Sequence, residues 1–380
     1  MHQNRAMFKD LRVLELASVL AGPSVGQFFA ELGANVIKVE NLRAGGDVTR
    51  TWKSKGEDTD DRSAYFCSVN WGKRSVAIDL ETAEGLDAVH RLAKRSDIVI
   101  ASYKPGDAEK LSVDYKTLKN LNDKLIYGQV TGYGAENSRV GYDAIIQAEA
   151  GFMYMNGEPG GASLKMPVAL IDVLAAHHLK EALLIALLKR QSSGEGSFVE
   201  VSLIDAAISS LVNQATNWLV GGVLPEKQGS THPNIAPYGD TFFTADDKEV
   251  LLAIGNDKQF YELCSLLNLA HLPSDADYIN NRARVVNRAS LNVLLQEKIG
   301  MITSGEFSAE CQRRNIPSGV IQNMEEVFRM KEAKEMILRA GGLSGVRTFA
   351  ARGQGTIAGI LPPPHFGEHT VLVMKELELE

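Results

Sequence analysis

Near the start of the chain, two short apolar segments enclose a turn and a helix-like run within about 30 residues. Arg12–Leu16 (RVLEL) and residues 35–39 (NVIKV) have the composition of strands, and residues 24–32 are typical of a helix that Gly33 ends. This order predicts a βαβ unit, which belongs to a parallel sheet. The turn Ala21-Gly22-Pro23 then falls at the carboxyl end of the first strand, where open α/β sheets bind ligands.

The alternation of strands and helices continues along the chain. Further strand-like segments occur at residues 75–79, 97–101, 125–130 and 197–203. Alternating elements with short turns predict an α/β fold with a doubly wound parallel sheet. The first turn lacks the G-x-G-x-x-G pattern, because Gly22 is followed by Pro23 and two further non-glycine residues. An ordinary nicotinamide dehydrogenase is therefore disfavoured.

The character of the sequence changes around residues 221–238, where frequent glycine and proline indicate a linker. Beyond it, residues 240–244 and 250–254 predict a β-hairpin, and residues 257–267, 282–299 and 304–314 predict helices. We therefore expect a large α/β domain over residues 1–220 and a linker with a small α+β domain over residues 221–325. A C-terminal segment follows over residues 326–380, with residues 371–374 β-like.

Charge and cysteine content exclude several classes of function. The 380 residues carry a formal net charge of −7, so no overall positive field attracts nucleic acid. The N-terminus has no signal-peptide core, and no apolar run of membrane-spanning length is free of charged residues. Cys67, Cys264 and Cys311 form no metal-binding spacing. We expect a cytoplasmic protein without a metal site, a nucleic-acid partner or a membrane partner.

A long apolar segment, residues 166–190, has one carboxylate near its start, Asp172. From Val173 onwards its apolar residues recur at helical spacing, and it ends in Lys189 and Arg190, the charges that a helix dipole favours there. Asp172 is suited to be the N-cap of this helix. It is equally suited to be a carboxylate held away from water as a nucleophile or base, and the two roles are compatible.

Several segments together resemble those of the family III CoA-transferases, a group that includes formyl-CoA transferase. They extend from about Phe8 to the C-terminus and read LRVLELASVLAGP, LGANVIKVE, GKRSVAIDL, KPGD, GYDAIIQAEAGFMYMNGEPG, ALIDVLAA, GEGSFVEVSL, THPNIAPYG and PPPHFGEHT. The resemblance implies a Rossmann-like large domain built from both chain ends and a small domain between them. It also implies an interlocked homodimer and no permanently bound cofactor, with coenzyme A or acyl-CoA as substrate.

The resemblance further implies that Asp172 attacks the thioester of an acyl-CoA. A mixed anhydride and then an aspartyl–CoA thioester would carry CoA to a small carboxylic acid. Backbone donors of the turn at residues 157–161 are a possible oxyanion hole. The positions that match CoA contacts of the family are Leu20, Ala21, Asn41, Ser102, Tyr103, Lys104, Lys110, Arg139 and Tyr142. Lys104 and Lys110 suit the phosphates of CoA, and Arg43 is near enough in sequence to join them.

Two departures from formyl-CoA transferase bear on the substrate. Leu20 stands where that enzyme has a glutamine, and residues 229–233 replace its glycine-rich substrate loop. Both differences argue against formate and oxalate. The segment THPNIAPYG instead resembles the branch that uses succinyl-CoA and short dicarboxylic acids.

Two alternative functions remain open from the sequence. One is an α-methylacyl-CoA racemase, a sister branch that pairs a histidine with the aspartate as opposed acid–base groups. Tyr142 occupies the position of that histidine, and His177 and His178 lie beyond Asp172 on the same helix, which favours the transferase. The other is a CoA-binding protein without catalysis, which would tolerate the loss of Asp172.

Overall fold

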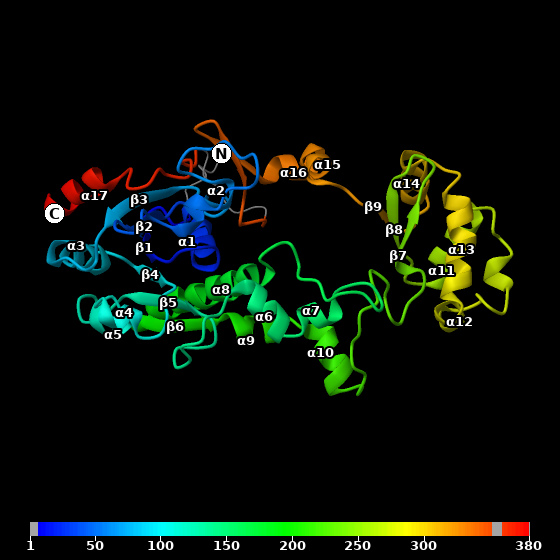
Figure 1. Cartoon of the computed structure of the whole chain (residues 1–380), viewed down its shortest axis with the longest axis horizontal. Helices are drawn as coiled ribbons and strands as arrows, with labels where there is room; N and C mark the ends of the chain where they lie inside the picture. Colours follow the sequence, from blue (N-terminus) through cyan, green and yellow to red (C-terminus); the bar gives the residue numbers. More distant parts are fainter. Residues whose placement is uncertain (1–6, 352–358, 380) are drawn as a thin grey trace. The chain divides into compact units, whose positions relative to one another are not determined.

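The computed structural model describes residues 7–351 and 359–379 (Figure 1). The predicted ranges 1–220 and 326–380 also include residues that lie outside this described part. The chain forms two compact units. The first combines Met1–Phe152, Lys165–Gly222 and Glu335–Glu380, and the second combines Met153–Leu164 and Val223–Lys334. Within the described residues, no helix is both long enough and apolar enough to cross a bilayer.

The first unit is built on a six-stranded sheet whose neighbouring strands are all parallel, in the order β3-β2-β1-β4-β5-β6. The strands are β1 (Arg12–Leu16), β2 (Asn35–Asn41), β3 (Lys73–Ile78), β4 (Ile98–Ala101), β5 (Ile126–Thr131) and β6 (Ser197–Ser202). The predicted doubly wound parallel sheet is confirmed. Strand order reverses between β1 and β4, so the carboxyl ends of these strands flank the crevice where such sheets bind ligands.

Helices cover both faces of this sheet (Figure 1). Successive side chains of a strand point to opposite faces, so neighbouring residues of one strand belong to different cores. Val13 of β1 belongs to a core with α1, α6, α8 and α9, whereas its neighbour Leu14 belongs to a core with α3, α5 and α17. The helices of the first core are α1 (Ala21–Glu31), α6 (Asp143–Glu149), α8 (Leu170–Ser193) and α9 (Leu203–Ser209). Those of the second are α3 (Ala83–Lys94), α5 (Tyr115–Lys119) and α17 (Thr370–Glu378). Both faces of the sheet are therefore buried under apolar side chains, as is typical of a parallel sheet.

Short elements complete the first unit and its connections. They are the 3-10 turn η1 (Val48–Thr51), α2 (Ala64–Cys67), α4 (Asp107–Lys110), α7 (Phe152–Met155), α10 (Val212–Leu219), and the antiparallel pair β10 (Ile337–Ala340) and β11 (Leu343–Val346). The segment that follows β6 is divided into two helices, α9 and α10. Ser210 donates its hydroxyl to the carbonyl of Ala206, and Val212 has a positive φ of 40°, so the helix stops between them.

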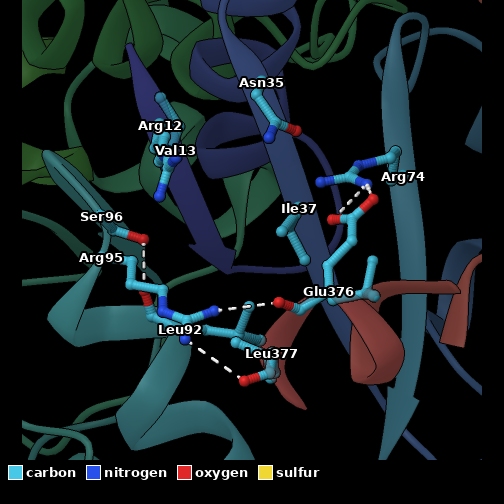
Figure 2. A pocket seen from close by; sticks show the side chains of 11 residues that line it. Arg12, Val13, Asn35, Ile37, Arg74, Leu92, Arg95, Ser96, Glu376 and Leu377 are labelled. Carbon is cyan, nitrogen blue, oxygen red and sulfur yellow. Dashed lines mark hydrogen bonds and ion pairs between the residues drawn. The ribbon is translucent and has the colours of Figure 1, made fainter. Parts of the chain in front are cut away.

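The C-terminal element corrects one expectation, because residues 371–374 belong to helix α17 and are not a strand. Val373 and Leu377 are one helical turn apart and are buried, whereas Val371 is exposed. Figure 2 shows how α17 is held beside β3 and α3, at the amino ends of the strands. Arg74 binds both carboxylate oxygens of Glu376, at 2.8 and 2.9 Å, and Arg95 donates to the carbonyl of Leu377 at 3.2 Å. Cations at the end of the helix thus satisfy its last carbonyls.

The second unit has its own sheet and core. Strands β7 (Tyr238–Phe243), β8 (Glu249–Ala253) and β9 (Ser318–Val320) form an antiparallel sheet, which confirms the predicted hairpin. Its helices are η2 (Leu272–Ser274), α11 (Asp257–Leu266), α12 (Asn281–Val286), α13 (Arg288–Ile299), α14 (Ser304–Arg313), α15 (Met324–Arg329) and α16 (Lys331–Met336). The side chains of α11, α13 and α14 pack with the strands in one apolar cluster. This α+β arrangement is the smaller domain type that the sequence predicts.

Candidate active site

A cavity of about 370 Å³ opens at the reversal point of the six-stranded sheet. Segments that follow β1, β4 and β5 form its walls, together with the start of α8 and the loop before α6. Because the carboxyl ends of parallel strands meet at one edge, residues far apart in sequence come together here. Its lining includes Ser18, Val19, Gly22, Val48, Trp52, Pro105, Val130, Thr131, Gly132, Val140, Gly141, Asp143 and Leu203.

Eight of the eleven residues predicted from the sequence also line this cavity. They are Leu20, Ala21, Ser102, Tyr103, Lys104, Arg139, Tyr142 and Asp172. Burial raises the pKa of Tyr103 to about 12, so its phenol stays protonated at neutral pH. The cavity therefore combines two carboxylates, Asp143 and Asp172, with hydroxyl groups and two cationic side chains.

The other three predicted residues lie outside the lining of the cavity. The side-chain oxygen of Asn41, at the end of β2, accepts the backbone N–H of Arg43 at 2.9 Å. The guanidinium of Arg43 is paired with the carboxylates of Asp79 and Glu81. Lys110 lies on α4, where its ammonium is 3.0 Å from the carboxylate of Asp107 three residues earlier. These residues order surface loops, and their CoA contacts stay a prediction.

The position of Asp172 in its helix differs from the expected one. Helix α8 begins at Leu170, so Asp172 lies inside the first turn and is not the N-cap. The preceding residue, Ala169, has no side-chain acceptor. The carboxylate of Asp143 supplies it instead, accepting the backbone N–H of Ile171 at 2.7 Å and that of Asp172 at 3.4 Å. The carboxylate that caps α8 is therefore that of Asp143, from an earlier helix, and not that of Asp172.

Burial and a second carboxylate set the protonation of Asp172. The residue is only 8% exposed. Removal from water disfavours its ionised form, and the negative charge of Asp143 adds to this, so that the pKa of Asp172 rises to about 7. A carboxylate of this basicity is a better proton acceptor and nucleophile than an exposed one, while half of it is still ionised at neutral pH.

Two aromatic residues near Asp172 come from the long connection between β2 and β3. Trp52 lines the cavity, and its ring meets that of Tyr65 edge to face at 5.1 Å between centroids. Burial, followed by the charges of Asp172, Asp143 and a third carboxylate, raises the pKa of Tyr65 to about 12. Our sequence reasoning missed Trp52, Tyr65 and Asp143. The single tryptophan in a long polar loop was the available signal for the first of them.

The loop between β5 and α6 is held against the sheet by close packing of glycines. A Cβ atom added to Gly132 would lie 2.7 Å from the Cα atom of Gly141, so neither position has room for a side chain. This contact fixes the loop that carries Arg139. The guanidinium of Arg139 lies 4.2 Å from the ring centre of Tyr133 and 2.6 Å from a carboxylate oxygen of Glu149. The loop therefore presents an oriented cation at the cavity.

Histidine does not contribute to the described lining of the cavity. His177 is exposed on α8, and His178 lies with its Nδ1 atom 3.8 Å from a carboxylate oxygen of Glu181 on the same helix. The acid–base partner that a racemase requires opposite Asp172 is therefore absent from the described residues of this cavity.

Comparison with known proteins agrees with this geometry. A family model described as CoA-transferase family III matches residues 8–370. The chain is 36% identical to the succinate–glutarate CoA-transferase of Agrobacterium fabrum, over 100% of this chain and 97% of that enzyme. It is 32% identical to the succinyl-CoA:glutarate CoA-transferase of Mus musculus, over 97% and 86% of the two chains. The solved structure of a CAIB/BAIF family protein from Brucella suis matches with a TM-score of 0.90 and 37% identity, over 99% of this chain and 100% of that one. The chain therefore belongs to CoA-transferase family III and is an enzyme of that class.

Proposed function

We propose that this enzyme moves CoA from succinyl-CoA, or a similar short acyl-CoA, to a small dicarboxylic acid, with Asp172 as its nucleophile. The observation that carries the proposal is a buried carboxylate of raised pKa that lines a cavity at the reversal point of the sheet. Such a group can accept an acyl group and a thiol in turn. The names of the relatives from Agrobacterium fabrum and Mus musculus, which act on succinate or succinyl-CoA and glutarate, support the choice of acids.

The proposed reaction has four steps that share one residue. The Asp172 carboxylate attacks the thioester carbonyl of the donor, which forms a mixed anhydride and releases the CoA thiolate. The thiolate attacks the aspartyl carbonyl, which gives an aspartyl–CoA thioester and frees the donor acid. The acceptor carboxylate attacks this thioester and forms a second anhydride with release of thiolate. The thiolate then attacks the acyl carbonyl, which yields the new acyl-CoA and restores Asp172.

The lining of the cavity supports binding of CoA in this reaction. Helix α1 begins at Ala21 without a side-chain cap, so its first backbone N–H groups and its dipole favour a phosphate or a developing oxyanion. Lys104 and Arg139 add positive charge at the same cavity. We propose that these groups bind the diphosphate of CoA, with Leu20, Ser102, Tyr103 and Tyr142 contacting the rest of the molecule.

A homodimer is the second part of the proposal. Apolar side chains are unusually exposed on α10 and just after it, where Val212, Trp218, Leu219 and Val220 are 67%, 55%, 77% and 85% exposed. Several exposed apolar side chains on one short segment fit a protein interface. We expect sedimentation velocity to give twice the mass of one chain, and Trp218→Glu to shift the equilibrium towards the single chain. A single-chain mass for the wild type at micromolar concentration would contradict the dimer.

The test of the catalytic proposal is the intact mass of the protein after mixing with succinyl-CoA, with and without hydroxylamine. We expect an adduct on the wild type, converted to a hydroxamate at Asp172, and none on Asp172→Ala. The matched control is Asp87→Ala, which removes an exposed aspartate from α3 and should still form the adduct. Glutaryl-CoA should appear when glutarate is added, faster than formyl- or oxalyl-CoA with formate or oxalate. An adduct on Asp172→Ala would overturn the assignment of the nucleophile.

Absence of an adduct with several acyl-CoAs would leave the two alternatives. Deuterium exchange at the α-carbon of a 2-methylacyl-CoA would then indicate a racemase, which the absence of histidine from the described cavity lining argues against. Binding of CoA with neither signal would indicate a protein that binds CoA without catalysis.

A further inference from the structure

Beneath one wall of the cavity lies a group of charged residues that catalysis does not use. Three cations and three carboxylates are each at most 5% exposed, although such residues are almost never fully buried unless paired. They are Lys38, Arg50, Lys73, Glu15, Glu40 and Asp47. Pairing holds all six in place, with 2.9 Å between Lys38 and Asp47, 2.8 Å between Lys73 and Glu15, and 2.6 Å between Arg50 and Glu40.

The first of these pairs contacts the turn that follows β1, on both sides of Ser18. The Lys38 ammonium donates to the carbonyl of Ala17 at 2.7 Å. The two carboxylate oxygens of Asp47 accept the backbone N–H of Val19 at 3.4 and 3.3 Å. One buried ion pair thus binds the carbonyl of Ala17 and the N–H group of Val19, on either side of Ser18. Ser18 and Val19 line the cavity.

The turn needs this support because its backbone is strained. Val19 has a φ of 71°, in the left-handed region that a β-branched residue strongly disfavours. A strained residue of this kind persists only where surrounding contacts over-determine its conformation. The ion pair supplies such contacts, and Val19 itself lies directly before Leu20 and the start of α1.

Asp47 also reaches a second wall of the same cavity. One of its carboxylate oxygens accepts the backbone N–H of Thr49 at 3.0 Å and its hydroxyl at 2.8 Å, which caps η1. Val48 and Trp52, at the two ends of this 3-10 turn, line the cavity. Asp47 is therefore bound at once to the turn after β1 and to the segment that carries Trp52.

We propose that the buried Lys38–Asp47 ion pair is a positioning device that fixes these two walls of the CoA cavity relative to each other. Asp47 is a positioning residue, because it acts on bound CoA only through the backbone of Val19 and through η1. The inference rests on the proposed function for its ligand, but the strained turn and its support exist in the free protein.

The sequence supplies a matched control at the other end of β1. There the carboxylate of Asp97 accepts the backbone N–H of Arg12 at 2.9 Å and pairs with Arg190 at 2.9 Å. Asp97 therefore does for the amino end of β1 what Asp47 does for the carboxyl end, but it lies away from the cavity. Asp97→Asn and Asp47→Asn should both lower stability, and only Asp47→Asn should affect CoA.

The experiment measures CoA affinity by calorimetry, KM and kcat for succinyl-CoA, and amide hydrogen exchange by NMR. We expect Asp47→Asn to weaken CoA binding by about tenfold or more, to raise KM more than it lowers kcat, and to speed exchange of the Val19 amide. Asp97→Asn should leave all three readouts unchanged. Asparagine at position 47 keeps an oxygen that accepts from Thr49, and glycine adopts positive φ without strain. Val19→Gly combined with Asp47→Asn should therefore return the affinity to within about threefold of wild type.

Equal effects of the two asparagine variants on affinity and exchange would overturn the proposal, as would failure of Val19→Gly to restore binding. If Asp47→Asn does not fold, the wild type still decides, because the Val19 amide of the unliganded wild type must exchange as slowly as the amides in β1. A protected Val19 amide in a wild type that neither binds CoA nor forms an adduct would refute the proposed function and leave the positioning device standing.

Discussion

Replacement of Asp172 by asparagine should make the enzyme more stable, by an amount that depends on pH. The pKa of Asp172 is raised from 3.8 to about 7 by burial and by the neighbouring Asp143. In the unfolded chain this side chain ionises near its ordinary value, whereas in the folded protein it resists ionisation. The wild type therefore loses stability as the pH rises from about 4 to about 7, and the loss is constant above that range.

The magnitude follows from the size of the shift. A rise of roughly three pKa units, at 1.36 kcal/mol for each unit, corresponds to about 4 kcal/mol. Because Asp172 lines a cavity and keeps a small exposed fraction, we expect Asp172→Asn to gain on the order of 2–4 kcal/mol above pH 8 and almost nothing at pH 4. Asparagine has nearly the same volume as aspartate, so packing is retained.

Urea unfolding followed by circular dichroism at pH 4, 6, 8 and 9 measures this difference directly. Asp87→Asn is the control, because it removes one negative charge from an exposed site and should change stability by less than about 0.5 kcal/mol at every pH. A gain for Asp172→Asn that is the same at pH 4 and pH 9, or a loss that grows with pH, would refute the electrostatic account of this site.

Three further predictions follow from single contacts. Asp143→Asn, which keeps an acceptor for the start of α8 but removes the charge, should shift the pH dependence of Asp172 acylation to lower pH, and Asp143→Ala should in addition cost about 1 kcal/mol in urea unfolding. Leu179→Ala should destabilise the protein by about 2–5 kcal/mol in the same assay, because Leu179 is fully buried on α8. Lys104→Ala should raise the KM for succinyl-CoA more than Lys110→Ala does, because only Lys104 lines the cavity; equal effects on KM would contradict this placement of CoA.

The fold could be predicted largely because it depends on local patterns. The buried strands β1, β2, β4 and β5 are short apolar runs, and their order along the chain fixes a parallel sheet whatever their contacts. Helix α17 was missed for the complementary reason. Residues 371–374 are four successive apolar residues, a run that fits a strand as well as a helix. The arginines that bind the end of α17 come from β3 and α3, about 280 to 300 residues earlier, so no local pattern contains the answer.

In the candidate site, too, local sequence patterns predict some residues, whereas others come together only through contacts between distant parts of the chain. Asp172 is marked in the sequence by the apolar segment around it, and Lys104 by its match to a CoA-contact position of the family. The cap of α8 is not marked, because Asp143 precedes that helix by almost 30 residues and meets it only in the folded chain. We predicted that Asp172 caps its own helix, because aspartate is a preferred N-cap residue at a helix start. It was wrong because the residue that caps and the residue that reacts are different carboxylates.

This division of roles gives a physical reason for the proposed chemistry. The free Asp172 carboxylate is disfavoured by burial and by the charge of Asp143. In the proposed anhydride and aspartyl–CoA thioester, Asp172 carries no charge, so both penalties vanish. The site thus destabilises the free nucleophile relative to the covalent intermediates by the same free energy, about 4 kcal/mol at most, that raises its pKa. Asp143→Asn should therefore lower the fraction of enzyme trapped as aspartyl–CoA at equilibrium, whereas the cap alone, which asparagine retains, would leave this fraction unchanged.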